Sequence, residues 1–290
     1  MIDLHLHSRF SDGLLTPAEL VERARLRGVT AIALTDHDTL QGNEEALLAG
    51  ERLGVKVISG VEFSVEVEGA AVHILGYGAS EPDEHARSMI SALIQGRESR
   101  LAKIVARIND LGIPISSAEV RRESGTEVIG RLHIARVLLR HRAVGSVREA
   151  FTRYLGRGAA AFVDRPRLSG KESIDLIHSL GAVAVLAHPG VVERENQGSL
   201  AATLDHLIGD GLDGLEAYYS THTLAQTQEF VKLAAERGLL VTGGSDFHRP
   251  ESGGPDIGSG TGRLKVPQEA LDNLEKAIAL RRSLNQAFSA

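Results

Sequence analysis

Apolar and polar residues alternate at the start of the chain, which predicts a β-strand over residues 2–7. The alternation sets Ile2, Leu4 and Leu6 against Asp3, His5 and His7. Side chains two apart on a strand point to the same side, so His5 and His7 can converge on one metal ion. Short apolar runs predict six further strands, at 31–35, 55–58, 71–75, 182–187, 214–217 and 239–242.

Helical patterns lie between most of these strands. Several begin at a capping sequence and end at glycine, as in 16–28, and this is typical of short surface helices. Alternating strands and helices predict an α/β fold with a parallel sheet, and seven units favour a closed or nearly closed (β/α)7 barrel.

The rhythm changes between residues 83 and 158, where helical patterns predominate. Residues 83–111 form one long amphipathic segment, a capping sequence begins at Ser116, and shorter helices are expected at 133–140 and 146–154. We therefore expect residues 1–82 and 159–290 to form a barrel domain, and residues 83–158 to form a helical insert domain that caps the active site.

Histidines and carboxylates collect where the predicted strands end. In parallel barrels the active site lies at the carboxyl ends of the strands. Any one such residue is ordinarily a solvated loop residue or a satisfied core histidine, but many at one end of an apolar sheet indicate a function. The residues concerned are His5, His7, Asp36, His37, Glu62, His73, His188, Asp246 and His248, with Asp12 in the turn after the first strand.

Composition narrows the chemistry. The chain has no cysteine, so disulfides and thiolate metal sites are excluded and any metal ligands must be nitrogen or oxygen. Its net charge of −6 argues against a broad nucleic-acid-coating surface, but not against a small anionic substrate. The sequence shows neither a signal-peptide pattern nor a membrane-length apolar stretch. We therefore expect a cytoplasmic protein, without a membrane role, and infer no protein partner.

Taken together and in order, these motifs resemble the PHP (polymerase and histidinol phosphatase) family of metal-dependent phosphoesterases. They are His5-x-His7, Ser11-Asp12-Gly13, Thr35-Asp36-His37-Asp38, Gly60-Val61-Glu62, His73, Ala187-His188-Pro189 and Gly244-Ser245-Asp246-x-His248. Residues 129–136 and 151–158 resemble the bacterial branch that hydrolyses nucleoside 3′,5′-bisphosphates and trims 5′-phosphorylated RNA from its 5′ end. Leu132 departs from the proline that related sequences often carry, so the local turn is expected to differ.

The resemblance implies a PHP-type distorted (β/α)7 barrel that holds three divalent ions. Mn²⁺ is expected, with Zn²⁺ or Fe²⁺ as alternatives. His5, His7, Glu62 and Asp246 would bind the first ion; Glu62, His73 and His188 the second; Asp12, His37 and His248 the third. Glu62, His188 and Asp246 would be the catalytic core, and a metal-bridged hydroxide would attack phosphorus.

Other residues are candidates for binding substrate or for orienting ligands. Arg131, His133 and Arg157 could hold substrate phosphates, although an arginine on a helix is equally well a surface cation. His222 could touch phosphate or the leaving group. Asp36 and Asp38 could orient histidine ligands, or Asp38 could be a helix N-cap.

The predicted activity is that of a phosphoric ester hydrolase. Its substrate would be a small phosphorylated molecule, either a nucleoside 3′,5′-bisphosphate or a short 5′-phosphorylated RNA. Two alternatives stay open: a phosphatase for small phosphomonoesters such as histidinol phosphate, and a non-catalytic PHP module.

Overall fold

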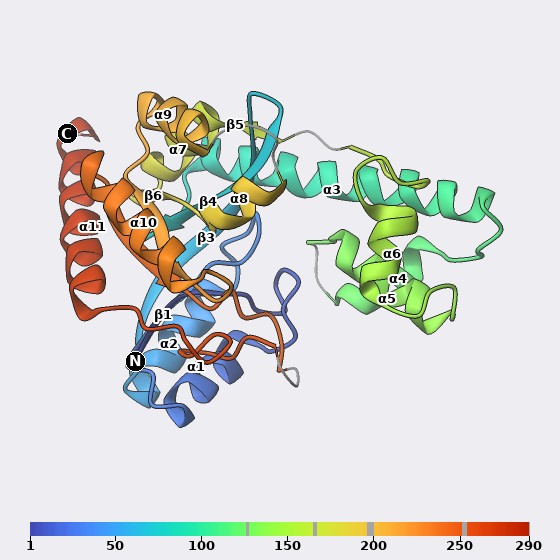
Figure 1. Cartoon of the computed structure of the whole chain (residues 1–290), viewed down its shortest axis with the longest axis horizontal. Coiled ribbons are helices and arrows are strands. Elements are labelled where there is room, and N and C mark those ends of the chain that lie inside the picture. The colour runs from blue at the N-terminus through green and yellow to red at the C-terminus, as the bar shows by residue number, and fades with distance from the viewer. Residues whose placement is uncertain (126–127, 165–166, 196–199, 251–253, 290) are drawn as a thin grey trace.

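The computed structural model describes residues 1–125, 128–164, 167–195, 200–250 and 254–289 (Figure 1). The strands are β1 (Ile2–Leu6), β2 (Ala31–Leu34), β3 (Lys56–Val67), β4 (Ala70–Tyr77), β5 (Leu168–Ser169), β6 (Val183–Leu186), β7 (Gly214–Tyr219) and β8 (Leu240–Gly244). The barrel helices are α1 (Pro17–Leu26), α2 (Asn43–Leu53), α7 (Gly170–Ser179), α8 (Pro189–Glu195), α9 (Leu200–Asp210), α10 (Leu224–Glu236) and α11 (Gln268–Ser289).

The strands form one sheet that curls into a nearly closed barrel, as the sequence predicted. Their order is β1-β2-β3-β4-β6-β7-β8, and the short β5, which was not predicted, pairs with β3. The segment after β8 returns to β1: the Asp246 N–H donates to the His5 carbonyl, and the His7 N–H donates to the Phe247 carbonyl, both at 2.9 Å. Gly244 permits this approach, because a Cβ there would lie 2.3 Å from the His5 nitrogen.

The sheet is not wholly parallel, and here the prediction was wrong. β3 continues past residue 58 to Val67, and β4 then runs antiparallel to both β3 and β6. A tight turn at Glu68 and Gly69, both with positive φ, joins β3 directly to β4. Without a crossover helix the next strand must reverse its direction. The first half of β4, with His73, therefore lies at the same edge as the carboxyl ends of the parallel strands.

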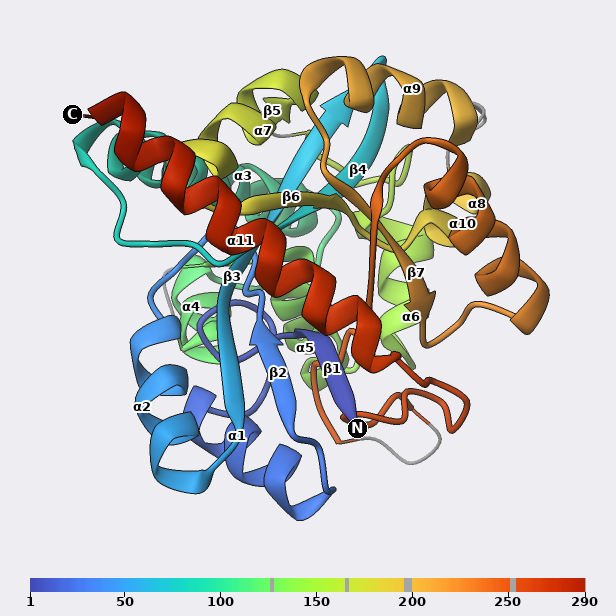
Figure 2. The same cartoon turned by 90° about the vertical axis from the view of Figure 1, so that its left-hand side faces the viewer.

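α11 closes the end of the barrel away from the helical insert (Figure 2). Its buried side chains Leu271, Leu274 and Ile278 pack with Leu4, Tyr77 and other interior residues of the barrel in one hydrophobic cluster. The remaining barrel helices cover the outside in two further clusters. The other end of the barrel, which faces the insert, is therefore the end where the strand-end histidines and carboxylates can be reached.

The helical insert comprises α3 (Glu84–Asp110), α4 (Ser117–Ser124), α5 (Arg131–Arg140), α6 (Val147–Ala150) and the π-helix η1 (Phe151–Leu155). The first half of α3, through Ala86, Ile90 and Leu93, packs in the barrel core. Its second half, from Leu101 on, belongs to a separate core that extends to Ala161. Figure 1 shows α3 running from the barrel to α4, α5 and α6. The division at residue 83 stays a prediction, since α3 belongs to both cores.

Several helices begin at the capping residues that the sequence predicted. Capping boxes are present at Thr16 and Ser116, as predicted, and also at Ser169; Asp83 caps α3 through the Ala86 N–H. None of the helices in the described ranges combines the length and the apolar character needed to cross a membrane.

Shortening the side chain of Leu274, which α11 buries in the barrel interior, should destabilise the fold. Leu274 is fully buried, so we expect Leu274→Ala to lower the free energy of unfolding by about 2–5 kcal/mol, through lost burial and the cavity that remains. Leu280, on the same helix, is 62% exposed, so Leu280→Ala should change it by less than about 0.5 kcal/mol. Urea unfolding followed by circular dichroism measures both, and equal effects would contradict the assigned packing of α11.

Candidate metal centre

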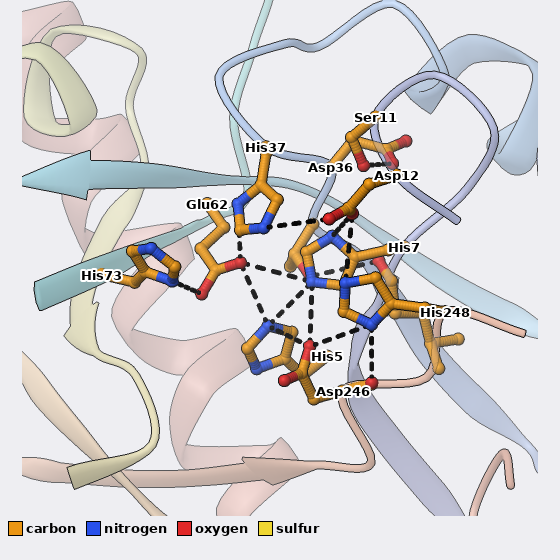
Figure 3. Close-up of polar contacts among 12 residues, drawn as sticks. His5, His7, Ser11, Asp12, Asp36, His37, Glu62, His73, Asp246 and His248 are labelled. Carbon is orange, nitrogen blue, oxygen red and sulfur yellow. Dashed lines mark hydrogen bonds and ion pairs between the residues drawn. The ribbon is translucent and has the colours of Figure 1, made fainter. Parts of the chain in front are cut away.

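The nine predicted metal ligands converge in one cluster at the open end of the barrel, and Figure 3 labels all of them except His188. They come from strands far apart in the sequence or from the turns that follow those strands. Contacts of 4.0 Å or less between side-chain nitrogen and oxygen atoms connect the whole set: His5, His7, Asp12, His37, Glu62, His73, His188, Asp246 and His248.

His5, His7 and Asp246 form the first group. The Nε2 atoms of the two histidines lie 3.1 Å apart. Asp246 Oδ1 is 3.4 Å from His5 Nε2 and 3.1 Å from His7 Nε2. Glu62 Oε2 approaches the same two nitrogens at 3.5 and 3.3 Å. The four residues predicted to share one ion therefore face a common space.

Glu62 lies at the centre of the cluster. Its Oε1 is 2.9 Å from His73 Nδ1 and 3.1 Å from His188 Nε2, while its Oε2 is 3.0 Å from His37 Nδ1. One carboxylate thus reaches both the His5–His7 side and the His73–His188 side, as a bridging ligand would.

Asp12 organises the third group. Its Oδ1 lies 3.1 Å from His248 Nε2 and 4.0 Å from His7 Nδ1, and its Oδ2 lies 3.9 Å from His37 Nε2. Ligand atoms of His7, Asp12, His37 and His248 all lie within 4.8 Å of one another. The geometry thus adds His7 to the three residues predicted to act together.

The donor set fits divalent metal ions. Two ligands 2.0–2.2 Å from one ion are at most about 4.4 Å apart, close to the spacings observed. His7 Nδ1, His37 Nδ1 and Glu62 Oε2 are buried and make no hydrogen bond within the described part of the chain. Buried polar atoms without hydrogen bonds are costly. These atoms are therefore suited to bind a metal ion rather than each other. A set of nitrogen and carboxylate ligands suits Mn²⁺, Zn²⁺ or Fe²⁺.

Comparison with known proteins agrees with this geometry. Residues 3–125 match the family model described as the PHP domain. A 3′,5′-nucleoside bisphosphate phosphatase from Chromobacterium violaceum is 36% identical over 262 residues, which cover 89% of this chain and 90% of that protein. A 5′-3′ exoribonuclease from Haemophilus influenzae is 36% identical over 248 residues, with 86% and 90% covered. A Bifidobacterium adolescentis structure described as a metal-dependent phosphoesterase superposes with a TM-score of 0.85 at 32% identity, covering 95% and 96% of the two chains.

The chain belongs to the PHP family of metal-dependent phosphoesterases. It is a hydrolase of phosphoric esters, and its clustered His, Asp and Glu side chains, called the PHP centre below, have the spacing that could hold metal ions. Which ligand binds which ion stays a prediction.

The electrostatics of the PHP centre favour bound cations. Burial alone would lower the pKa of His7, but Asp246 and Glu62 beside it raise that pKa to about 10. Burial would raise the pKa of Glu62, but His73, His37 and His5 hold it well below its usual range. Burial lowers the pKa of His73 to about 4. Glu62 is therefore anionic and His73 neutral at pH 7, the forms that metal ligands of these two types take.

Asp36 and Asp38 hold loops rather than orienting histidines. Asp36 accepts hydrogen bonds from the Ser8 N–H, the Ser8 hydroxyl and the Ser11 hydroxyl at 2.5–2.7 Å, so it fixes the turn that carries Asp12. Asp38 has a φ of +53° and pairs with Arg97 of the insert, whose Nε is 2.7 Å away. The N-cap of α2 is Gly42. Neither of the roles predicted for Asp38 is correct.

A cavity of about 270 Å³ lies beside the PHP centre, between the barrel and the insert. The barrel contributes Asp12, His37, His73 and His188, and the insert and its return segment contribute Arg97, Arg100, Arg131, Phe151 and Arg167. The predicted substrate residue Arg131 is thus at the cavity. Its Nη1 donates to the Leu155 carbonyl at 2.9 Å, and its guanidinium carbon lies 5.4 Å from the centre of the Phe151 ring.

The other three predicted substrate residues lie elsewhere, and the structure gives two of them another role. His133 is buried, and its Nδ1 accepts the Gly130 N–H, so it shapes the turn before Arg131. His222 donates from Nδ1 to the Ala217 carbonyl and accepts the Gly190 N–H at Nε2, which leaves neither nitrogen for substrate. Arg157 is exposed and is not among the residues that line the cavity.

Glu216 was not among the functional residues predicted from the sequence. It is fully buried in β7, and its Oε1 accepts a hydrogen bond from His5 Nδ1 at 2.9 Å. The available signal was a carboxylate within the short apolar strand 214–217, because such a charge is costly unless it is paired. Tyr219, from the same strand, was also missed; its hydroxyl donates to Asp246 Oδ2 at 2.8 Å.

Removing the shared carboxylate should disable the centre. We expect Glu62→Ala to lose at least one bound ion and to reduce turnover by more than the about 10- to 100-fold that loss of an outer contact costs. Its circular dichroism spectrum should match the unaltered protein. Glu236→Ala, which removes the same charge from the exposed end of α10, is the control. Full ion content by mass spectrometry together with unchanged turnover in Glu62→Ala would show that the site is wrongly assigned.

Proposed function

We propose that this PHP enzyme hydrolyses a phosphate ester of nucleoside 3′,5′-bisphosphates and of short 5′-phosphorylated RNA. The centre would be trinuclear and hold Mn²⁺, in the ligand groups predicted from the sequence. Relatives named for these two activities share most of their length with this chain. A nucleotide substrate agrees with the cytoplasmic location expected from the sequence.

The observation that carries the proposal is the charge arrangement of the cavity. One wall contains metal ligands, among them His37, His73 and His188. The insert side of the lining contributes Arg100 and Arg131; Arg97 and Arg167 also line the cavity, but their charges are balanced by Asp38 and by Glu66 and Asp164. A molecule with one phosphate needs only the metal side, so a cationic wall opposite it favours a substrate with a second phosphate.

The insert as a whole is cationic, although the chain is acidic. Residues 83–158 contain 14 of the chain's 32 Lys and Arg residues but only 8 of its 38 Asp and Glu residues. This field attracts a polyanion toward the cavity mouth. It supports a nucleotide or short RNA over a small phosphomonoester such as histidinol phosphate, the alternative left open by the sequence.

The residues divide the chemistry among them. Bound divalent ions would neutralise the phosphoryl oxygens and lower the pKa of a coordinated water toward 7. Glu62, His188 and Asp246 would hold those ions in fixed positions. Arg131 would hold the second phosphate, with its planar guanidinium kept in place by the Leu155 carbonyl and by Phe151.

A turnover comparison tests the proposed substrate class. With Mn²⁺ present, kcat/KM should be highest for adenosine 3′,5′-bisphosphate and a short 5′-phosphorylated RNA, and lower for AMP and histidinol phosphate. A preference for histidinol phosphate would replace the proposal with the small-monoesterase function. No turnover of any ester by protein of full ion content would favour a non-catalytic module.

Arg131→Ala should separate the two phosphate positions. Loss of a charge-assisted contact with the second phosphate costs about 1.5–3 kcal/mol. We therefore expect about a 10- to 150-fold lower kcat/KM for adenosine 3′,5′-bisphosphate and a much smaller loss for p-nitrophenyl phosphate.

Arg157→Ala is the matched control, since it removes the same charge from the same insert at an exposed position outside the cavity lining. It should leave both values of kcat/KM within about twofold, in the range of a surface change. Equal losses on the two substrates in Arg131→Ala would place Arg131 at the reacting phosphate. No loss on either would make it a structural residue of the insert.

A further inference from the structure

Glu216 connects two segments of the metal centre from a strand that carries none of the predicted ligands. Its Oε1 lies 2.9 Å from His5 Nδ1, and its Oε2 accepts the backbone N–H of His188 at 2.7 Å. His5 is on β1 and His188 follows β6, so one side chain of β7 joins both. The Glu216 side chain has no exposed surface, and both oxygens of this buried carboxylate are used.

The backbone of β7 is shaped to place this side chain. The pairing of β7 with β8 changes register between Glu216 and Tyr218, as at a β-bulge. A bulge changes the direction of side chains along a strand. Here Glu216 and Tyr219, three residues apart, both reach the centre: Glu216 contacts His5, and Tyr219 contacts Asp246.

We propose that Glu216 is a positioning residue of the metal centre, which keeps the His5 proton on Nδ1 and holds the turn that carries His188. The inference rests on the metal centre proposed above. A carboxylate accepts hydrogen bonds only, so His5 donates from Nδ1, and in the neutral ring that binds a metal Nε2 then presents the lone pair. That Nε2 is the nitrogen that faces His7 and Asp246.

The second oxygen of Glu216 acts on a strained backbone. His188 has a φ of +32°, which is rare for a residue with a side chain. Such conformations persist only where surrounding contacts enforce them. The bond from the His188 N–H to Glu216 is one such contact, and it fixes the direction in which the His188 ring reaches Glu62.

Glu216→Gln tests whether residue 216 must accept two hydrogen bonds, one from His5 and one from His188. A carboxamide has one acceptor oxygen and one NH2 donor, so it cannot accept from both His5 and His188. If its oxygen stays on the His188 N–H, its NH2 group faces His5 Nδ1. His5 must then accept there and carry its proton on Nε2, the nitrogen needed for the ion. If the amide is reversed, the turn at His188 loses its bond instead.

Asp213 supplies a matched control near the opposite end of the same strand. Its Oδ2 lies 2.8 Å from His178 Nε2 and accepts the Ala184 N–H at 2.8 Å, so it too bridges an imidazole and a backbone amide. Asp213 precedes β7, whereas the metal centre lies at the other end of the barrel strands. Its Oδ1 pairs with Arg281, so Asp213→Asn also removes an ion pair, but it makes the same change from carboxylate to carboxamide away from the centre.

Mn²⁺ titration calorimetry on the full chain tests the proposal. Loss of an outer-shell partner of a ligand typically weakens metal affinity by about 10- to 100-fold, and we expect this in Glu216→Gln. Asp213→Asn should bind Mn²⁺ as the unaltered protein does, even if its melting temperature falls. Unchanged affinity in Glu216→Gln, or an equal loss in Asp213→Asn, would overturn the positioning role.

A second measurement uses the unaltered protein and so does not depend on a variant that folds. In ¹⁵N-histidine-labelled protein loaded with Zn²⁺, the His5 ring, assigned by its absence in His5→Gln, should carry its proton on Nδ1. A proton on Nε2 would overturn the proposal. Unaltered protein that binds neither Mn²⁺ nor Zn²⁺ would instead overturn the metal centre itself, and so the two failures can be told apart.

Discussion

The structure depends on placing three carboxylates, one buried and two partly buried, among six imidazoles at one end of an apolar barrel. Buried charges are tolerated only when they are paired or bind metal. Here each carboxylate faces at least two histidines, and Glu62, at the centre, is almost fully buried. The backbone bonds that close the barrel, such as the one from the Asp246 N–H to the His5 carbonyl, also place two of the ligands. The contacts that close the barrel therefore also assemble part of the site.

Local strain is concentrated at this end of the barrel. His188 and Asp246 both have positive φ. Each lies two residues after the end of a strand, β6 or β8, and belongs to the cluster. Such residues cost about 1–3 kcal/mol each. Side chains of β7 contact both positions: Glu216 accepts the His188 N–H, and Tyr219 donates to the Asp246 carboxylate. β7, a strand without predicted ligands, thus contacts both strained residues. The register shift between Glu216 and Tyr218 lies at the part of β7 that makes these contacts.

The convergence of the nine candidate ligands could be predicted from the sequence, because histidines and carboxylates at strand ends meet wherever the strands form one barrel. The direction of β4 could not, since it depends on a turn at Glu68 and Gly69 that the sequence did not mark as a hairpin. The roles of Asp36 and Asp38 were wrong for a related reason. Their partners, Ser8 and Arg97, are 28 and 59 residues away, and residue spacing carries no information about such distant contacts. Glu216 was overlooked because its partners likewise lie on other strands.

The contact between Arg97 and Asp38 fixes the insert to the barrel. α3 is one continuous helix with its first half in the barrel core and its second half in the insert core. Between the two, buried Arg97 pairs with buried Asp38, the residue after the ligand His37. Breaking a buried pair by removing one partner costs about 3–5 kcal/mol, so this junction resists opening. The cationic cavity wall is therefore a fixed part of the fold rather than a mobile lid, and the distance from its arginines to Glu62 is set when the chain folds. The proposed bisphosphate would then be selected by whether the spacing of its two phosphates matches that fixed distance.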